Sequence, residues 1–178
     1  WNPGGIVGVW AEENTRSVIF DALKAREVFA TSGPRIQVKL EASANSLSCE
    51  VNASGITAMG GEMTKLANGP SFRIQALYDS TPLESIEVIK GELRNGQLRE
   101  QTIGVWQKPS GDLDVCITWK DPDFDSKAPA FWYARVLEAR TLRWSAHHCR
   151  RENRCGDFPG AETTIQERAW SSPIWYLP

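Results

Sequence analysis

Three groups of side chains in this sequence have the residue types and spacing of chemical sites. The first group is a pair of histidines beside cysteines: His147 and His148 precede Cys149, and Cys155 follows nearby. Imidazole nitrogen and thiolate sulfur are both ligands that zinc prefers. Adjacent histidines usually point apart, however, and no Cys-x-x-Cys or His-x-x-x-His pair accompanies them. We therefore expect a disulfide and solvent-facing imidazoles here, and no metal site.

A second group consists of aspartates at every second position, Asp121, Asp123 and Asp125. Such spacing directs carboxylate oxygens at calcium when the backbone wraps around the ion. The calcium signature is incomplete, because no glycine stands at the sharp-turn position and Trp132 occupies the twelfth position, where a glutamate is required. The pattern favours a solvated loop between two strands, since Asp and Pro residues are typical of turns.

The third group is Glu12, Glu13 and Arg16, between a strand-like run at residues 6–10 and a helical pattern. Enzymes of the α/β-barrel class place their working residues where a strand ends and a helix begins. The three residues are therefore candidates for the rim of an active site. The plainer interpretation is a helix start, where carboxylates are favoured by the helix dipole and a Glu–Arg pair is a surface contact.

The remaining pattern is mostly that of strands. Apolar and polar residues alternate over residues 36–41 and 72–78, as expected when one face of a sheet is buried. The Asn95-Gly96 pair between residues 86–93 and 98–106 predicts a tight hairpin. Further strand patterns cover residues 113–119 and 130–138. At least six strands with turns between them predict a mainly β fold, an Ig-like antiparallel β-sandwich.

The N-terminal segment forms a separate βα pattern. Its helix carries an apolar face of Val18, Ile19, Ala22 and Leu23, and it follows the strand-like run at residues 6–10. A single βα unit cannot bury both its strand and its helix, so we expect a sheet or a partner beyond this unit.

The last third is less regular. Residues 143–151 favour a short helix, and Pro173 and Pro178 argue against a central strand near the end. We expect the C-terminal aromatic residues to pack on the N-terminal βα unit.

Eight tryptophans are more than a sandwich core of this size requires. Trp119, Trp132 and Trp144 are expected in the interior. Four other aromatic residues are candidates for a platform that binds a partner, a carbohydrate or a substrate: Trp10, Trp170, Trp175 and Tyr176. Packing in the core or between domains is the alternative for all four.

Four cysteines are compatible with two disulfides. Cys149 and Cys155 flank a short polar loop, and Cys49 and Cys116 each lie in a β-like alternation, so we predict these two pairs. An even count fits an oxidising compartment. The sequence permits three connectivities, and four reduced, partly buried thiols are the alternative.

Length and charge narrow the class of protein. The 178 residues suit one domain with an appendage, and a formal charge of −2 gives no electrostatic indication of a nucleic-acid partner. No apolar run approaches the length that spans a bilayer, and the first residues lack the features of a signal peptide. If the protein is exported, we expect the signal upstream.

Several segments together resemble one protein family. They are Trp10 to Arg16, Ala30 to Arg35, Asp121 to Asp125, Phe131 to Glu138, Arg143 to Ser145 and Ile165 to Tyr176. They are similar to the C-terminal region of a large bacterial exported family that is catalogued as a domain of unknown function. The N-terminal half of that family resembles the PHP (polymerase and histidinol phosphatase) metal-dependent phosphoesterases.

This resemblance implies a division of the chain. Residues 1–33 would be a βα segment like the end of a PHP-like barrel, residues 34–140 a β-sandwich, and residues 141–178 an arm that packs on the first segment. The His-x-His motif of a PHP centre is absent from the sequence, so this chain alone is expected to bind no catalytic metal or cofactor, whereas the parent would bind divalent metal ions.

Two functions follow as hypotheses. In the first, the chain is the accessory, non-catalytic sandwich of a PHP-like hydrolase that acts on a phosphoester or a related substrate, and its partner is the missing barrel. In the second, it is a non-catalytic binding or scaffolding subunit of a larger extracytoplasmic complex. The cysteines and the resemblance together predict a periplasmic or secreted protein. The substrate, the partner and the oligomeric state are not specified by the sequence.

Overall fold

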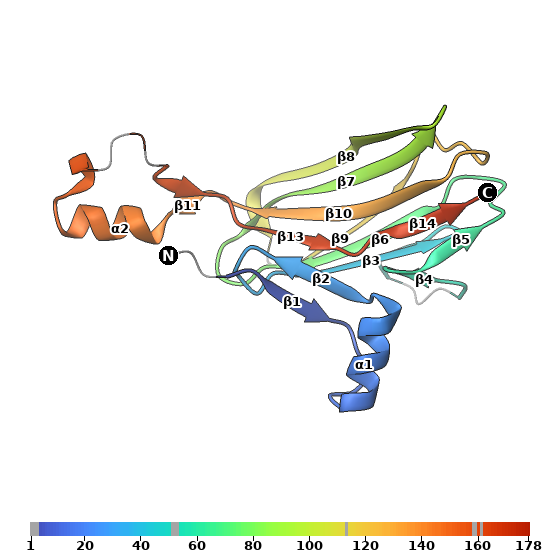
Figure 1. Ribbon diagram of the computed structural model, residues 1–178, viewed down its shortest axis with the longest axis horizontal. Helices are drawn as coiled ribbons and strands as arrows, with labels where there is room; N and C mark the ends of the chain where they lie inside the picture. Colours follow the sequence, from blue (N-terminus) through green and yellow to red (C-terminus); the bar gives the residue numbers. More distant parts are fainter. Residues whose placement is uncertain (1–3, 51–53, 113, 158–159, 161) are drawn as a thin grey trace.

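The computed structural model describes residues 4–50, 54–112, 114–157, 160 and 162–178. The chain is mainly β, and two antiparallel layers face each other across a common core (Figure 1). The predicted β-sandwich is therefore confirmed. Asn52-Ala53-Ser54 matches the triplet of N-glycosylation sites, and its first two residues lie outside the described residues.

The larger sheet runs in the order β1-β2-β13-β10-β7-β8, and β14 and β5 continue from the side of β10 that also carries β13. All of its pairings are antiparallel except that of β14 with β5. The strands are β1 (Ile6–Val9), β2 (Val28–Thr31), β13 (Arg168–Ser171), β10 (Ala130–Glu138), β7 (Leu83–Arg94), β8 (Gln97–Asp112), β14 (Ile174–Leu177) and β5 (Glu62–Thr64).

The smaller sheet has the order β4-β3-β6-β9, all antiparallel. Its strands are β4 (Thr57–Ala58), β3 (Gln37–Ser43), β6 (Ser71–Leu77) and β9 (Asp114–Lys120). The two sheets meet through inward-facing apolar residues, and the rings of Phe72 and Trp132 lie 5.3 Å apart across the interface. Trp132 is fully buried, and Trp119, the cross-strand neighbour of Phe72, stacks on it with the ring centroids 5.9 Å apart.

The simple alternation predicted for β3 and β6 fails at one pair of residues. Glu41 and Arg73, expected on an exposed face, are only 6% and 7% exposed. They stand opposite each other in register, and Arg73 Nε donates to Glu41 Oε2 at 2.7 Å. Burial opposes ionisation of Glu41, but hydrogen bonds from Arg73 and Lys39 outweigh it and hold the pKa of Glu41 below its usual value.

The predicted β7–β8 hairpin is confirmed. Asn95 and Gly96 both have positive φ values, 52° and 73°, as a two-residue primed turn requires. Asn tolerates this conformation and Gly adopts it freely, so these two residues determine the register of the longest strand pair in the fold.

The end of the chain contradicts the expectation that its prolines exclude interior strands. β13 lies between β2 and β10, and β14 lies between β10 and β5. Pro173 falls in the break between these two strands and Pro178 follows the second, so neither proline removes a donor from within a strand. Part of this segment pairs with the strand that follows α1, because β13 pairs with β2 and sets Trp170 opposite Ala30.

Two helical parts project from the sandwich (Figure 1). α1 (Arg16–Ala25) follows β1, and α2 (Trp144–Arg151) precedes a 3₁₀ turn, η1 (Cys155–Asp157). A two-stranded ribbon, β11 (Thr141–Leu142) with β12 (Thr164–Ile165), connects the α2 part to the sandwich. The predicted helix near residue 143 is confirmed. Trp144, expected in the interior, is 47% exposed because it lies on this projecting part.

Residues on both sides of positions 34 and 140 contribute strands to the same larger sheet, because β1 and β2 come from the N-terminal segment and β13 and β14 from the C-terminal one. In the part of the chain that the structure describes, no helix is long and apolar enough to cross a membrane.

Candidate functional site

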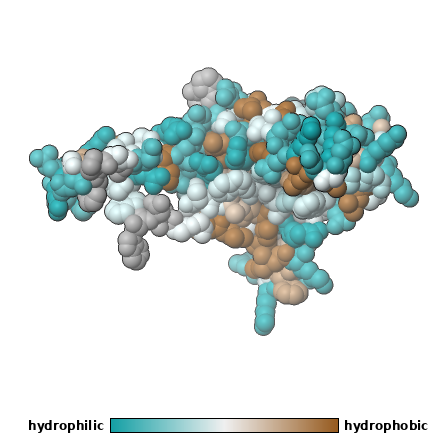
Figure 2. Space-filling view, turned by 45° about the horizontal axis from the view of Figure 1, so that its top comes forward, coloured by the Kyte–Doolittle hydropathy of each residue, from teal (hydrophilic) through white to brown (hydrophobic). Residues whose placement is uncertain are grey.

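The strongest candidate for an interaction site is the unit formed by β1, α1 and the loop between them, here called the β1–α1 arm (residues 6–25). Its large apolar side chains face solvent: Val7 is 69% exposed, Phe20 63%, Leu23 48% and Ile6 39%. Figure 2 shows a hydrophobic patch on the part of the surface that projects from the body. Within α1 only Ala22 is buried. The arm thus exposes much of the apolar surface that a helix normally buries.

Contacts at the end of the helix hold the arm on the sandwich. Arg26 has a left-handed conformation with φ of 63° and ends α1. Its guanidinium donates to the carbonyl of Gly60 at 2.8 and 2.9 Å. Gly60 has a φ of 86°, and a Cβ there would lie 2.5 Å from backbone oxygens of Ala25 and Arg26. A glycine is therefore required where the helix end meets the body.

A tryptophan holds the strand of the arm. Trp10 donates its indole N–H to the carbonyl of Val38 at 2.9 Å, and its ring lies 5.8 Å from that of Phe29. Both contacts lie on the sandwich side of β1. The base of the arm is consequently fixed, while its apolar face remains open.

The candidate rim residues Glu12, Glu13 and Arg16 lie on this arm. All three are exposed, in the connection from β1 to α1 and at the first position of the helix. Arg16 also lines an open depression with Phe20 and Leu23. The structure thus places three charged side chains close in sequence to the exposed apolar face.

The four candidate platform residues do not share one surface. Tyr176 is buried and donates its hydroxyl to the carbonyl of Ser126 at 2.9 Å. Trp10 packs against the core. Trp170 is partly buried, and Trp175 is 38% exposed with its ring 5.1 Å from that of Phe131.

Both predicted disulfides are present. Cys49 pairs with Cys116, and Cys149 pairs with Cys155. The first fastens the segment after β3 to β9, and the second closes the loop between α2 and η1. His147 and His148 are exposed, and the Nδ1 of His148 lies 3.1 Å from an Arg151 nitrogen. The disulfide lines a cavity of about 700 Å³ together with Trp144 and Arg154.

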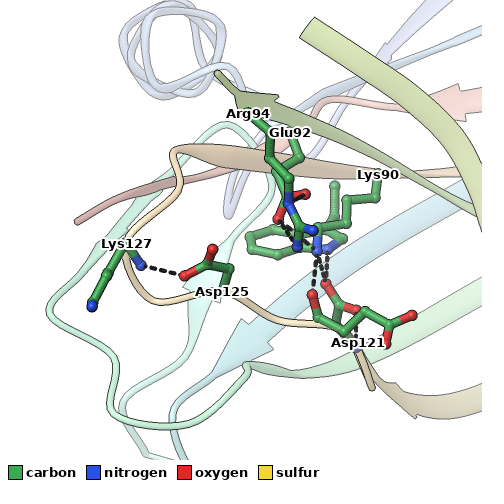
Figure 3. Close-up of polar contacts among 8 residues, drawn as sticks. Lys90, Glu92, Arg94, Asp121, Asp125 and Lys127 are labelled. Atoms are coloured by element: carbon green, nitrogen blue, oxygen red, sulfur yellow. Dashed lines mark hydrogen bonds and ion pairs between the residues drawn. The ribbon is translucent and has the colours of Figure 1, made fainter. Parts of the chain in front are cut away.

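The aspartate loop differs from its prediction at its first residue. Asp121 has a fully buried side chain and forms an ion pair with Lys90 at 2.7 Å (Figure 3). It also accepts the indole N–H of Trp132 at 3.1 Å. Asp121 is thus a structural partner inside the sandwich and not part of a solvated loop, because a cation and an indole donor offset the cost of its burial. Asp123 and Asp125 keep turn roles: Asp123 N–H donates to Asp121, and Lys127 N–H donates to Asp125.

The residues around Lys90 form a second candidate site, here called the hairpin cleft. It is a polar cavity of about 420 Å³ between the β7–β8 hairpin and the aspartate loop. Its lining consists of Lys90, Glu92, Arg94, Arg99, Gln101, Asp123 and Phe124. The sequence contained a signal for it: the inward positions of β7 change from Ile86 and Val88 to Lys90 and Glu92, and charged residues that continue a buried face need partners.

A buried acid at the opposite end of β10 is a third unusual feature. Glu138 is 2% exposed, and its Oε1 has no hydrogen-bond partner among the described residues. Burial raises its pKa to about 7; the charges of Asp79 and Glu167 add to the rise, and a backbone hydrogen bond at Asp79 offsets part of it. No local pattern indicated this group, because its neighbours come from distant segments.

Comparison with known proteins gives one match. Residues 1–109 and 102–178 match the family described as a protein of unknown function (DUF3604), so the two matched segments together span the chain. No curated protein and no solved structure matches the sequence.

Proposed function

Because the chain belongs to the DUF3604 family, we propose that it is the accessory, non-catalytic β-sandwich region of a PHP-like metal-dependent hydrolase whose substrate is a phosphoester or a related compound. In this proposal the β1–α1 arm is the surface on which the sandwich packs against the catalytic domain. The observation that carries the proposal is the exposed apolar face of that arm.

The arm has the construction of a docking element. Its base is anchored by Trp10 and Arg26, so it has a fixed direction relative to the sandwich. Val7, Phe20 and Leu23 are exposed on the arm. Contact with a partner would remove their apolar surface from water, which is favourable. A rigid, preformed surface loses little conformational freedom on binding, which favours a stable contact.

The charged residues of the arm give the proposed contact a functional role. Arg16 lines the depression that contains Phe20 and Leu23, and the exposed Glu12 and Glu13 precede it in the connection from β1 to α1. A domain that covers the apolar face would therefore meet Arg16 and come near the two glutamates. We propose that Glu12, Glu13 and Arg16 line the rim of the catalytic domain's substrate opening. Divalent metal ions would be bound by the catalytic domain and not by this chain.

The two disulfides support an extracytoplasmic location, because such bonds form and persist in oxidising compartments. The proposal therefore places the hydrolase in the periplasm or outside the cell.

The test uses the complete protein encoded by the gene that contains this chain. Phe20→Ser with Leu23→Ser removes the apolar face of α1. The matched control is Leu98→Ser with Val105→Ser, which changes two similarly exposed apolar residues, 63% and 55% exposed, on β8 at the opposite edge of the sheet. Metal content, phosphoesterase activity and thermal unfolding are measured for each variant.

We expect the Phe20 and Leu23 variant to lose activity, and its two domains to unfold in separate thermal transitions. The control variant should keep the activity and the thermal unfolding of the unsubstituted protein. A gene product without a metal-dependent domain would overturn the proposal, as would equal behaviour of the two variants.

A scaffolding subunit of an extracytoplasmic complex is the second candidate function. It is favoured by the position of β1 as an edge strand, since an unpaired strand edge beside an apolar helix can pair with another chain. A gene that encodes only this region, with a product that co-purifies in a defined complex through the arm, would favour this second function over the first.

A further inference from the structure

The hairpin cleft lies at the edge of the larger sheet opposite the β1–α1 arm, because β8 and β1 are the outermost strands in the order β1-β2-β13-β10-β7-β8. The β7–β8 hairpin forms the upper edge of the sandwich in Figure 1, and α1 projects below it. The cleft is consequently independent of the proposed contact with a catalytic domain.

Cross-strand register places the polar side chains of the cleft on one face. Lys90 stands opposite Gln101, and Glu92 stands opposite Arg99. Each of these pairs points toward the aspartate loop, which contributes Asp123 and Phe124 to the lining. Two strands and one loop thus surround a cavity of about 420 Å³, which is within the usual range for a small-molecule site.

The charged side chains on the inner wall of the cleft are paired with groups of this chain. Lys90 Nζ has three acceptors: Asp121 at 2.7 Å, Glu92 at 3.2 Å and the carbonyl of Asp123 at 3.0 Å. Arg94 Nε lies 2.5 Å from the other oxygen of Glu92 (Figure 3). The buried cation and the two carboxylates beside it therefore form a closed network, and it leaves no acidic oxygen of Glu92 without a partner.

The outer part of the cleft keeps donors that this network does not use. Within the described residues, no ion pair or side-chain hydrogen bond involves Arg99 or Gln101, and Arg94 is 46% exposed in its side chain. A guanidinium presents a planar pair of N–H groups that matches an oxoanion. With Glu92 engaged, the guanidinium of Arg99 is available to an anionic group, and the carboxylate of Asp123 is the other charged group of the lining outside the network.

The cleft also presents groups that suit hydroxyls and an apolar ring face. The Asp123 carboxylate accepts and the Gln101 amide both donates and accepts, so each can bind an alcohol. The partly buried Phe124 ring adds an apolar surface. We propose that the hairpin cleft binds a hydroxylated ring that carries one oxoanion, that is, a sugar acid or a sugar phosphate, with Arg99 on the anion and Asp123 and Gln101 on the hydroxyls.

The test is a titration of the full chain with small-molecule probes, monitored by amide NMR and by calorimetry. The probes are D-glucuronate, D-glucose 1-phosphate, unmodified D-glucose and inorganic phosphate. Saturable shifts confined to residues 90–101 and 121–125 are expected with glucuronate or glucose 1-phosphate. The stronger of these two probes identifies the preferred anion. D-Glucose and inorganic phosphate are each expected to bind more weakly than the stronger of the two anionic sugars.

Arg99→Ala is expected to weaken binding about tenfold or more, because it removes a charge-assisted pair of hydrogen bonds. Arg140→Ala is the matched control, since Arg140 is exposed and lies outside the cleft, and it is expected to leave the affinity unchanged. Thermal unfolding of both variants reports whether the fold is retained.

Three results would overturn the proposal. They are the absence of saturable shifts with both anionic sugars at millimolar concentration, full affinity in a folded Arg99→Ala variant, and inorganic phosphate that binds as tightly as the sugars.

Discussion

The two outer edges of the larger sheet differ in the charged side chains that they bury. At the β7–β8 edge, charged residues are buried: the side chains of Lys90 and Asp121 are only 2% and 0% exposed. At the β1 edge, apolar residues are exposed, with Val7 at 69% and Phe20 at 63%. Each buried charge has partners from another segment of this chain, whereas the apolar residues of the arm have no covering element among the described residues. Apolar residues are exposed at both edges, since Leu98 and Val105 of β8 also face solvent. The β7–β8 edge is nevertheless self-contained in its buried charges, whereas the β1 edge carries a projecting apolar helix that is suited to a partner.

The strongest test of the self-contained edge is Lys90→Met. This change keeps most of the side-chain length but leaves Asp121 buried without its cation and Glu92 with Arg94 as its remaining cation. Removal of one partner of a buried ion pair typically costs about 3–5 kcal/mol of unfolding free energy. We expect a loss of that order, measured by urea unfolding.

The control for Lys90→Met is the double variant with Asp121→Asn, which removes the unpaired charge but keeps an acceptor for the Trp132 indole. It is expected to recover part of the loss. If the single variant unfolds within about 0.5 kcal/mol of the parent, the range of ordinary surface changes, then the network does not stabilise this edge.

Local patterns in the sequence predicted much of the sandwich. The Asn95-Gly96 turn and the alternation around Val38 and Leu40 depend on neighbouring residues, so they can be recognised from a short window. The pairing of Cys49 with Cys116 was predicted because both lie in strand-like patterns.

The buried charges were not predicted, because their partners are distant in sequence. Asp121 was interpreted as a loop residue, and only the folded topology brings Lys90 to it. Pro173 was misleading for a related reason: a proline excludes an interior position of a strand but not the break between two strands. Trp144 was assigned to the core from its residue type alone, although the α2 part projects from the sandwich.

The two disulfides differ in the length of chain that each closes, one in the sandwich and the other in the α2 projection. Cys49 and Cys116 are separated by 67 residues, and Cys149 and Cys155 by 6. In the chain-entropy description, the longer closed loop restricts the unfolded chain more. Replacement of Cys49 and Cys116 by serine is expected to cost about 4 kcal/mol, and that of Cys149 and Cys155 about 2 kcal/mol.

Urea unfolding of the two serine variants, each against the parent under oxidising conditions, measures both effects. Equal losses would contradict the chain-entropy argument. Peptide mapping without reductant checks that the remaining disulfide of each variant is intact.

Glu138 is a buried acid whose Oε1 has no hydrogen-bond partner among the described residues, unlike the charged groups around Lys90. Its pKa in the folded chain is raised from 4.5 to about 7, so the folded state keeps the proton over a pH range in which the unfolded chain has released it. The unfolding free energy from this group is therefore highest below pH 4.5, falls as the pH rises to about 7, and is then constant. The total fall is about 3 kcal/mol.

Glu138→Gln resembles the protonated acid and should remove this part of the pH dependence. We expect the variant to be more stable than the parent above pH 7 and similar to it at pH 4. Glu50→Gln, at an exposed position, serves as the control and should retain the parental slope. Identical pH profiles of the Glu138 variant and the parent would show that Glu138 is ionised in the folded chain without cost.

The smallest effect on stability is expected at the arm. Phe20→Ser with Leu23→Ser changes side chains that are already in solvent, so the isolated chain should unfold within about 0.5 kcal/mol of the parent, apart from the helix propensity of serine. Retention on a hydrophobic-interaction column should fall clearly, because the variant removes exposed apolar area. Phe29→Ala provides the contrast on the strand that pairs with β1: Phe29 is buried on β2, and its loss should cost about 3 kcal/mol. A large loss of stability in the Phe20 and Leu23 variant would mean that the arm packs on its own chain, and the two edges of the sheet would then be equally self-contained.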